Sequence, residues 1–321
     1  MIKELSYYDK IIISTSGGKD STATILNLLE NGAKPEQMEL WHQCVDGRGD
    51  TCRSFFDWPS TDGYVKQMAK HLNISLSYQW REYGFYGELY RENQRTNDVR
   101  FERYGVSGHL PSSPYGKEST RLKWPAKTAS LNTRWCSAYL KIDVASRALT
   151  NMPDLKGKRI LFVTGERREE SAARSKYKES ELHRTNSKSR LVHHWRPVIE
   201  WKESQIWEIM QKHTIMPHPA YYLGFPRLSC RSCIFLSKDH WATLKEVSPE
   251  VISMISDVEN DLNFTLDNKF KINELSRMGK SLLTEENHKY IKMAVSEFNH
   301  KITTNNWILP AGAFGSGGGS L

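Results

Sequence analysis

Residues 16–21, Ser-Gly-Gly-Lys-Asp-Ser, have the composition of a phosphate-binding loop. They follow a β-branched run, Ile11 to Ile13, and lead into a helical pattern. Glycines let backbone N–H groups approach an anion closely, and the N-terminus of a helix adds positive potential. Ser16 and Ser21 can donate hydroxyl hydrogen bonds, whereas Asp20 is suited to holding Mg²⁺ or to ordering the loop. The spacing matches neither the Walker A pattern nor Gly-x-Gly-x-x-Gly.

A second motif runs from Gly165 to Arg174, directly after a predicted strand. The guanidinium groups of Arg167 and Arg174 can bind phosphate or sulfate oxygens in a bidentate manner, with Glu170 and Ser171 ordering them. Because ligands of open α/β sheets bind outside the carboxyl ends of the strands, we expect this motif beside the first loop. A salt-bridged helix start is the alternative interpretation.

The cysteines form the third group with chemical potential. A Cys-x-x-Cys pair indicates metal, cluster or redox chemistry, because two thiolates at this spacing can bind one metal ion or one edge of a cluster. We expect a cytosolic protein without a disulfide framework, since the sequence shows neither a secretory signal nor a run of about 20 apolar residues. The five cysteines are Cys44, Cys52, Cys136, Cys230 and Cys233.

The segments around these motifs predict an α/β fold, in which strands alternate with helices and form a parallel twisted sheet flanked by helices. Residues 81–134 show no clean period, which is typical of a functional lid or mobile loop. Strands are expected at residues 10–15, 38–45, 74–80 and 158–165. Helices are expected at residues 21–29, 64–72, 137–149, 203–213, 239–263 and 285–300.

Positive charge is concentrated in two stretches of the chain. The net charge is +8, with 10 Lys and Arg against 4 Asp and Glu in residues 91–141, and 9 against 5 in residues 165–196. Such clustering suits nucleotide phosphates or a nucleic-acid backbone. A solvated basic surface is the alternative interpretation.

The loop at residues 16–21 resembles the Ser-Gly-Gly-x-Asp-Ser loop of the PP-loop ATP pyrophosphatases at every position. The pattern Gly-x-Arg-x-x-Glu-Ser-x-x-Arg at residues 165–174 resembles the corresponding loop of the phosphoadenylylsulfate (PAPS) reductase-like branch, which includes CysH-like and DndC-like proteins. The resemblance covers residues 8 to 235. Its further motifs are Arg134-Trp135-Cys136 with Lys141, Trp195-Arg196-Pro197 with Trp201, and Tyr222-x-Gly224-x-x-Arg227-x-x-Cys230-x-x-Cys233.

The resemblance implies an adenine nucleotide alpha-hydrolase-like domain that cleaves ATP between the α and β phosphates and releases pyrophosphate. We expect this domain at residues 1–235, a helical region at residues 236–310, and a disordered Gly/Ser-rich tail at residues 311–321. Asp46 ends the second predicted strand, where the family has an acidic residue near the nucleotide. The expected catalytic residues are Lys19, Asp20 and Arg167. The expected nucleotide contacts are Ser16, Gly17, Gly18, Lys19, Asp20, Ser21, Asp46, Gly165, Arg167, Glu170, Ser171 and Arg174.

Iron–sulfur members of this family place cysteines after Arg-Trp and in the late loop, so the resemblance implies Cys136, Cys230 and Cys233 as metal ligands. Three ligands leave one iron of a 4Fe-4S cluster open, or require a fourth ligand from elsewhere. Cys44 and Cys52 are candidates for that ligand or for a persulfide carrier, and ordinary structural cysteines are the alternative. Structural zinc is the main alternative to a cluster.

Sulfonucleotide reductases use a nucleophilic cysteine in a C-terminal tail, and this sequence has no cysteine after Cys233. We therefore expect an ATP-dependent sulfurtransferase-like enzyme that activates a nucleic-acid acceptor, as in DNA phosphorothioation. A cysteine desulfurase or another sulfur carrier would be its partner, and the C-terminal helices are candidates for a homodimer contact. One alternative is a PAPS or adenylylsulfate reductase that uses a partner thiol. Another is a nucleotide-binding regulatory subunit of a defence or prophage system.

Overall fold

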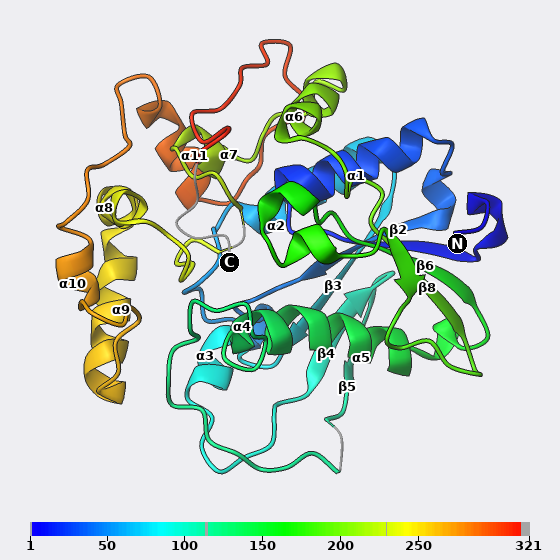
Figure 1. Cartoon of the computed structure of the whole chain (residues 1–321), viewed down its shortest axis with the longest axis horizontal. Coiled ribbons are helices and arrows are strands. Elements are labelled where there is room, and N and C mark those ends of the chain that lie inside the picture. Colours follow the sequence, from blue (N-terminus) through cyan, green and yellow to red (C-terminus); the bar gives the residue numbers. More distant parts are fainter. Residues whose placement is uncertain (1, 113–114, 229, 316–321) are drawn as a thin grey trace.

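The computed structural model describes residues 2–112, 115–228 and 230–315, and is organised around one eight-stranded sheet (Figure 1). The strands are β1 (Lys10–Ser14), β2 (Met38–Gln43), β3 (Ser75–Arg81), β4 (Val99–Arg103), β5 (Val106–Leu110), β6 (Arg159–Val163), β7 (Ser180–Leu182) and β8 (Leu191–Trp195). Their order is β5-β4-β3-β2-β1-β6-β8-β7. The five strands from β3 to β8 in this order are parallel, and β4, β5 and β7 pair antiparallel at the two edges. The predicted α/β fold is confirmed.

Helices cover both faces of this sheet. They are α1 (Lys19–Glu30), α2 (Thr61–Leu72), α3 (Gly84–Leu89), α4 (Trp135–Ser137), α5 (Asp143–Asn151), α6 (Glu203–Lys212), α7 (Pro219–Tyr222), α8 (Lys238–Val247), α9 (Pro249–Leu262), α10 (Ile272–Leu275) and α11 (Ile291–Val295). A π-helical turn, η4 (Ala138–Ile142), joins α4 to α5. None of the helices within the described ranges is long and apolar enough to cross a membrane.

Alternation along β1 explains the layers. Ile11 and Ile13 are fully buried in the larger core, together with residues of α1, α2 and α6. Ile12 is fully buried in a second core that includes the inner face of α5. Because successive side chains of a strand point to opposite faces, one run of three isoleucines serves both cores. Figure 1 shows α5 on one face of the sheet and α1, α2 and α6 on the other.

The sequence analysis missed the hairpin of β4 and β5, which lies in the stretch expected to be irregular. Tyr104 and Gly105 connect the two strands with φ values of 51° and 76°. Two successive residues with positive φ are typical of a type I′ hairpin turn, for which Asn-Gly or Asp-Gly is the usual signal. Tyr-Gly does not give that signal, and β5 has little apolar alternation. β7 and β8 were missed for a similar reason, since His193 and His194 interrupt the apolar pattern of β8.

The hairpin also neutralises a carboxylate in the middle of the sheet. Glu39, on β2, is fully buried and accepts hydrogen bonds from Arg103 at 2.7 and 2.9 Å, from Tyr104 at 2.6 Å and from Ser77 at 2.7 Å. Burial alone would raise the pKa of Glu39, but Arg103 and these donors hold it below its ordinary value. Arg103 also binds Asp154 at 2.6 Å. Ionic contacts therefore fasten β4 to the centre of the sheet.

The C-terminal region differs from its prediction in two places. The helix expected over residues 239–263 is two helices, α8 and α9, which meet at Ser248 and Pro249. Proline lacks the N–H group that continues a helix, so it begins α9 instead. The helix expected over residues 285–300 is reduced to a 3-10 turn and α11.

Residues 296–315 form an extended segment, here called the C-terminal strap. Its backbone pairs with two neighbouring segments, through Met216 N–H to the Ile302 carbonyl at 2.8 Å and Gly312 N–H to the Tyr221 carbonyl at 2.8 Å. Residues 311–315, which we placed in a disordered tail, thus form a turn on α7. A Cβ at Gly312 would lie 2.3 Å from the Phe225 carbonyl oxygen, so glycine is needed for this packing. Residues 316–321 of the predicted tail lie outside the described residues.

Candidate nucleotide-binding site

The order of the strands reverses at β1. From β1 the chain adds β2 and β3 on one side, and later β6 and β8 on the other. The crevice outside the carboxyl ends of two such strands is the usual ligand site of an open α/β sheet. Residues 16–21 follow β1 and residues 165–174 follow β6, so both predicted motifs lie at this point.

Gly165 allows the two motifs to touch. A Cβ at this position would lie 2.8 Å from the carbonyl oxygen of Asp20 and 3.0 Å from the backbone nitrogen of Ser21. Real Cβ atoms do not approach backbone atoms this closely, so any side chain would displace one of the two loops. The structure gives Gly165 a packing role beside the phosphate loop, and its predicted contact with a nucleotide stays a prediction.

The N–H groups of the phosphate loop are engaged by hydroxyl oxygens. Gly17, whose φ is 74°, donates to Thr15 Oγ1 at 3.2 Å, and Gly18 donates to Ser16 Oγ at 3.4 Å. Lys19 N–H donates to Tyr221 Oη at 2.9 Å. Hydroxyl oxygens are neutral acceptors, and charged oxygens make hydrogen bonds about twice as strong. A phosphate oxygen can therefore replace them with a gain in free energy.

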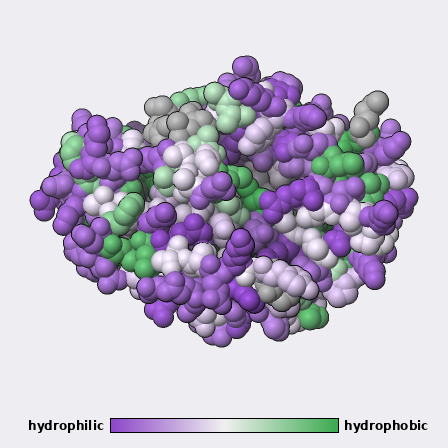
Figure 2. All heavy atoms as spheres, turned by 60° about the horizontal axis from the view of Figure 1, so that its bottom comes forward, coloured by the Kyte–Doolittle hydropathy of each residue, from purple (hydrophilic) through white to green (hydrophobic). Residues whose placement is uncertain are grey.

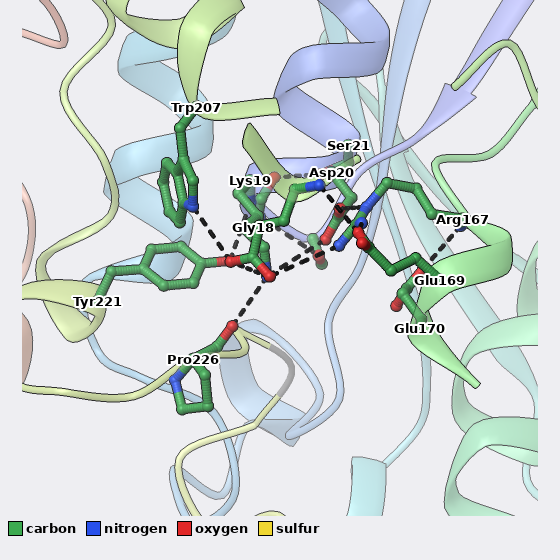
Figure 3. Close-up of polar contacts among 12 residues, drawn as sticks. Gly18, Lys19, Asp20, Ser21, Arg167, Glu169, Glu170, Trp207, Tyr221 and Pro226 are labelled. Carbon is green, nitrogen blue, oxygen red and sulfur yellow. Dashed lines mark hydrogen bonds and ion pairs between the residues drawn. The ribbon is translucent and has the colours of Figure 1, made fainter. Parts of the chain in front are cut away.

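The ammonium group of Lys19 lies at the centre of the site (Figure 3). It donates to the Pro226 carbonyl at 2.9 Å and lies 3.7 Å from both Asp20 Oδ2 and Glu203 Oε1. The rings of Trp207 and Tyr221 are 5.9 and 5.6 Å from it. Its side chain is only 6% exposed, so the charge is desolvated and its partners count strongly.

Arg167 approaches the loop from the opposite side. Its Nε donates to Asp20 Oδ1 at 2.6 Å and its Nη1 to Glu169 at 2.6 Å, while Nη2 lies 4.0 Å from Glu203. Burial alone would raise the pKa of Asp20, but Lys19 and Arg167 outweigh burial and hold that pKa below its ordinary value. Two buried cations thus share three carboxylates, and Asp20 stays ionised.

The rest of the second motif orders its arginines. Glu170 accepts from the backbone N–H of Arg167 at 2.8 Å and pairs with the Arg174 guanidinium. Ser171 Oγ accepts from the backbone N–H of Arg174 at 3.2 Å. These contacts agree with the ordering role expected from the spacing. Arg174 forms its ion pair with Glu170 and also acts electrostatically on Asp20.

Asp46 shapes a neighbouring loop, and its predicted contact with the nucleotide stays a prediction. Its carboxylate accepts hydrogen bonds from the backbone N–H groups of Phe55, Phe56 and Asp57, at 2.8 to 3.0 Å. Burial raises the pKa of Asp46 to about 6, and these N–H donors oppose that rise. The loop that it shapes reaches the Cys-x-x-Cys segment, where Ser232 Oγ donates to the Phe55 carbonyl at 3.0 Å.

The three predicted ligand cysteines share one cationic neighbour, the half-buried Lys141. Cys136 lies on α4, and Cys230 and Cys233 lie in the loop after α7. Burial raises the pKa of the Cys136 thiol to about 11, to which Cys233 adds while Lys141 opposes. Burial also raises the pKa of Cys230 well above its ordinary value, and Lys141 again opposes the rise. The donor types and the nearby cation fit a thiolate-bound metal. In residues 2–112, 115–228 and 230–315, however, no three His, Cys, Asp or Glu side chains are arranged closely enough to hold one.

The loop that carries the Cys-x-x-Cys pair contacts the phosphate loop. Lys19 binds the Pro226 carbonyl, and a Cβ on Gly18 would lie 3.2 Å from the Leu228 carbonyl, two residues before Cys230. Cys44 is buried in a small cluster with Tyr78 and Trp80, and Cys52 is exposed.

The sequence analysis did not find Glu203 or Tyr221 as site residues. Tyr221 lies 202 positions from Lys19, and no local pattern indicates that its hydroxyl meets the loop. Glu203 was visible only as the first residue of a predicted helix. Its carboxylate is placed by that helix start, where it also accepts from Trp207 Nε1 at 3.1 Å.

Residues 10–235 match the phosphoadenosine phosphosulfate reductase domain, which covers both loops and the Cys-x-x-Cys segment. The chain belongs to this domain family. The predicted membership of the PP-loop, PAPS reductase-like family is therefore confirmed. Such a domain is a nucleotide-binding enzyme domain of the sulfonucleotide-reductase-like type.

Several proteins resemble this PAPS reductase-like chain. An uncharacterized 37.8 kDa protein of Escherichia phage 186 is 28% identical over 263 residues, which cover 77% of this chain and 74% of that protein. An adenosine 5'-phosphosulfate reductase of Burkholderia cepacia is 26% identical over 30% of this chain and 35% of its own length. The corresponding enzyme of Allochromatium vinosum is 24% identical over 46% of this chain and 52% of its own length. The chain thus spans about half or less of the two reductases.

Solved structures with a related arrangement include a phosphoadenylyl-sulfate reductase of Candida auris and an FMN adenylyltransferase of Candida glabrata. The first has a TM-score of 0.37 and 13% identity, and covers 69% of this chain and 81% of its own. The second has a TM-score of 0.37 and 13% identity, and covers 70% of this chain and 55% of its own.

Proposed function

We propose that this PAPS reductase-like chain is an ATP-dependent enzyme that releases pyrophosphate and activates an acceptor for sulfur incorporation. The observation that carries the proposal is the pair of buried cations, Lys19 and Arg167, on opposite sides of a loop whose N–H groups are held by neutral hydroxyls. Together they can accept a polyphosphate by exchange of partners. We also propose residues 1–235 as the nucleotide-binding domain and residues 236–310 as a helical appendage.

Each part of the site has a defined task in such a reaction. The N–H groups of Gly17, Gly18 and Lys19 bind phosphate oxygens. The ammonium of Lys19 and the guanidinium of Arg167 stabilise the negative charge that develops on departing pyrophosphate, because preorganised charges in a desolvated site need no reorganisation. Asp20, kept ionised by its two cationic neighbours, is the carboxylate that would hold Mg²⁺, which neutralises phosphate charge when bound.

Pyrophosphate release tests this assignment. We expect Asp20→Ala to abolish release from ATP while the protein remains folded. Asp257→Ala, on the exposed face of α9, is the matched control and should retain full turnover. Turnover by the Asp20 variant at the rate of the control would refute the mechanism.

Cys136, Cys230 and Cys233 are the residues that would hold a cluster beside this site. A thiolate-bound 4Fe-4S cluster with one open iron supplies a place for a sulfur atom, whereas zinc supplies only structure. Anaerobic purification with iron and sulfide counts and a visible spectrum distinguishes the two. We expect broad absorption near 400 nm that is lost in Cys136→Ala, and stoichiometric zinc without iron would overturn the cluster.

The matches to two adenosine 5'-phosphosulfate reductases favour a second candidate, a sulfonucleotide reductase with a thiol from a partner. The C-terminal strap reaches Glu203 through the backbone N–H of Phe314, which donates to it at 3.1 Å. Residues 296–315 contain no cysteine, so the strap brings no thiol to the site. Sulfite formation from adenylylsulfate with added thioredoxin would establish this candidate. A regulatory subunit, in contrast, would bind ATP without releasing pyrophosphate.

A further inference from the structure

A cavity lies apart from the nucleotide site, against the outer face of α5. Its volume is about 540 Å³, and side chains from successive turns of α5 form its floor. The lining side chains Asp143, Arg147 and Thr150 follow helical spacing of three or four residues, so they share one face. The opposite wall comes from Arg184 and Thr185, which follow β7. Figure 2, which brings the lower part of Figure 1 forward, shows this side of the molecule as largely hydrophilic.

Positive charge exceeds negative charge in this cavity. Asp143 is contacted by three guanidinium groups: Arg81 at 2.5 Å, Arg147 at 3.1 Å and Arg184 at 3.7 Å. Asp143 faces three guanidinium groups, and Glu88 also acts on the buried Arg81, so the remaining excess of positive charge lies at Arg147 and Arg184. Arg81 is fully buried behind the carboxylate, whereas Arg147 and Arg184 line the cavity and Arg184 is 53% exposed. The excess charge therefore faces the cavity.

The unpartnered hydroxyl of Ser146 indicates that a ligand of this cavity would carry acceptor oxygens. Ser146 lines the cavity and is 6% exposed. Its Oγ has no hydrogen-bond partner within the part of the chain that the structure describes. Buried polar groups nearly always have a partner, because an unmade hydrogen bond costs about 1–3 kcal/mol. A ligand oxygen in the cavity would supply that partner.

We propose that this cavity binds the phosphodiester backbone of a nucleic-acid strand. The guanidinium groups of Arg147 and Arg184 match phosphate oxygens, and Ser146, Thr150 and Thr185 offer hydroxyl donors. Pro111 and the ring of Tyr115 also line the cavity, so a base can pack there, while the guanidinium and hydroxyl groups suit the phosphates. A nucleic acid bound here would be the acceptor that the proposed function activates, so this inference rests on that function.

The helix that forms the floor of the cavity also leads to one of the predicted ligand cysteines. α5 continues through η4 to α4, which carries Cys136. Asp143 and Cys136 are seven positions apart, which corresponds to about 10 Å along a helix. A nucleic-acid strand that lies along α5 would therefore extend from the cavity toward Cys136.

Anisotropy of a labelled 20-nucleotide single-stranded DNA, titrated with the full chain at several salt concentrations and without ATP, tests the proposal. We expect Arg147→Gln and Arg184→Gln each to weaken binding roughly tenfold, the effect of losing one charged hydrogen bond. Each should also lower the slope of log affinity against log salt by roughly 0.7, the value for one phosphate contact on a single strand. Arg277→Gln, an exposed arginine beyond α10, is the control and should bind like the wild type.

Ser146→Ala separates a binding role from a structural one. The substitution removes an unpartnered hydroxyl, so it should leave the thermal midpoint unchanged or raised, and it should weaken DNA binding about three- to tenfold. The side chain of Arg184 is exposed, so its substitution leaves the core intact. Unchanged affinity and salt slope in Arg184→Gln would overturn the proposal. Binding of AMP in the cavity without binding of the oligonucleotide would also overturn it. Because no ATP is present, either result is independent of the pyrophosphate assay.

Discussion

Glu203 competes with phosphate for the two cations of the nucleotide site, so Glu203→Gln should tighten nucleotide binding. Its carboxylate lies 3.7 Å from Lys19 and 4.0 Å from Arg167, and its side chain is 19% exposed. The glutamine retains an oxygen for the N–H groups of Trp207 and Phe314, which now bind Oε1 at 3.1 Å each. The substitution therefore removes the charge and preserves the packing.

The size of the effect follows from the distances. A pair of unit charges about 4 Å apart interacts by roughly 4 kcal/mol at an effective dielectric constant of 20. Most of this energy is recovered when phosphate takes the place of the carboxylate, so only the difference reaches the affinity. We expect a gain of about 1.4 kcal/mol, which is a tenfold lower Kd.

Isothermal titration calorimetry with the non-hydrolysable analogue α,β-methylene ATP measures this change directly. Glu208→Gln, an exposed glutamate on the same helix, should bind the analogue as the wild type does. Weaker binding by Glu203→Gln would refute the reasoning, since it would mean that Glu203 positions Lys19 for phosphate and does not compete with it.

Three further substitutions test the packing and titration of the fold. In Gly165→Ala the new Cβ would lie 2.8 Å from the Asp20 carbonyl oxygen. The substitution should therefore lower the unfolding free energy by about 1–3 kcal/mol and weaken binding of the ATP analogue. A Kd equal to that of the wild type would show that the two loops adapt. Tyr221→Phe removes the acceptor for the Lys19 N–H, so it should lower the unfolding free energy by about 1 kcal/mol without nucleotide and by less with saturating ATP analogue. An equal loss in denaturant titrations with and without the analogue would contradict this. Burial lowers the pKa of His218 to about 3, so the unfolded chain takes up a proton below pH 6.5 while the folded chain does not, and stability falls as pH drops from 6.5 toward 3. His218→Gln should remove about 2 kcal/mol of that loss between pH 7 and 5, and parallel pH profiles for both proteins would exclude the effect.

Local signals were sufficient for the parts of the site that lie on consecutive residues. The glycines and hydroxyls of residues 16–21 indicated a phosphate loop because they follow a strand and precede a helix. The motif at residues 165–174 could be placed beside it because carboxyl ends of parallel strands meet at one edge. The five parallel strands did form, although β8 was not recognised.

Contacts between distant segments could not be predicted. The hydroxyl of Tyr221 reaches Lys19 only because α7 packs on the start of α1, and nothing in its neighbourhood marks it. Asp46 follows β2 at the edge where ligands bind, and three backbone N–H groups take up its carboxylate. The position of a residue at such an edge predicts its neighbourhood, whereas its hydrogen-bond partners depend on the loops that fold over it.

Glu39 has a consequence for the order in which the chain can fold. This carboxylate belongs to the second strand, but its neutralising partner Arg103 comes 64 residues later on β4. An unpaired carboxylate in the middle of a sheet costs roughly 3–5 kcal/mol. We therefore expect β2 to be stable at the centre of the sheet only after β4 has brought Arg103 to it. The centre of this sheet depends on a residue supplied by its edge.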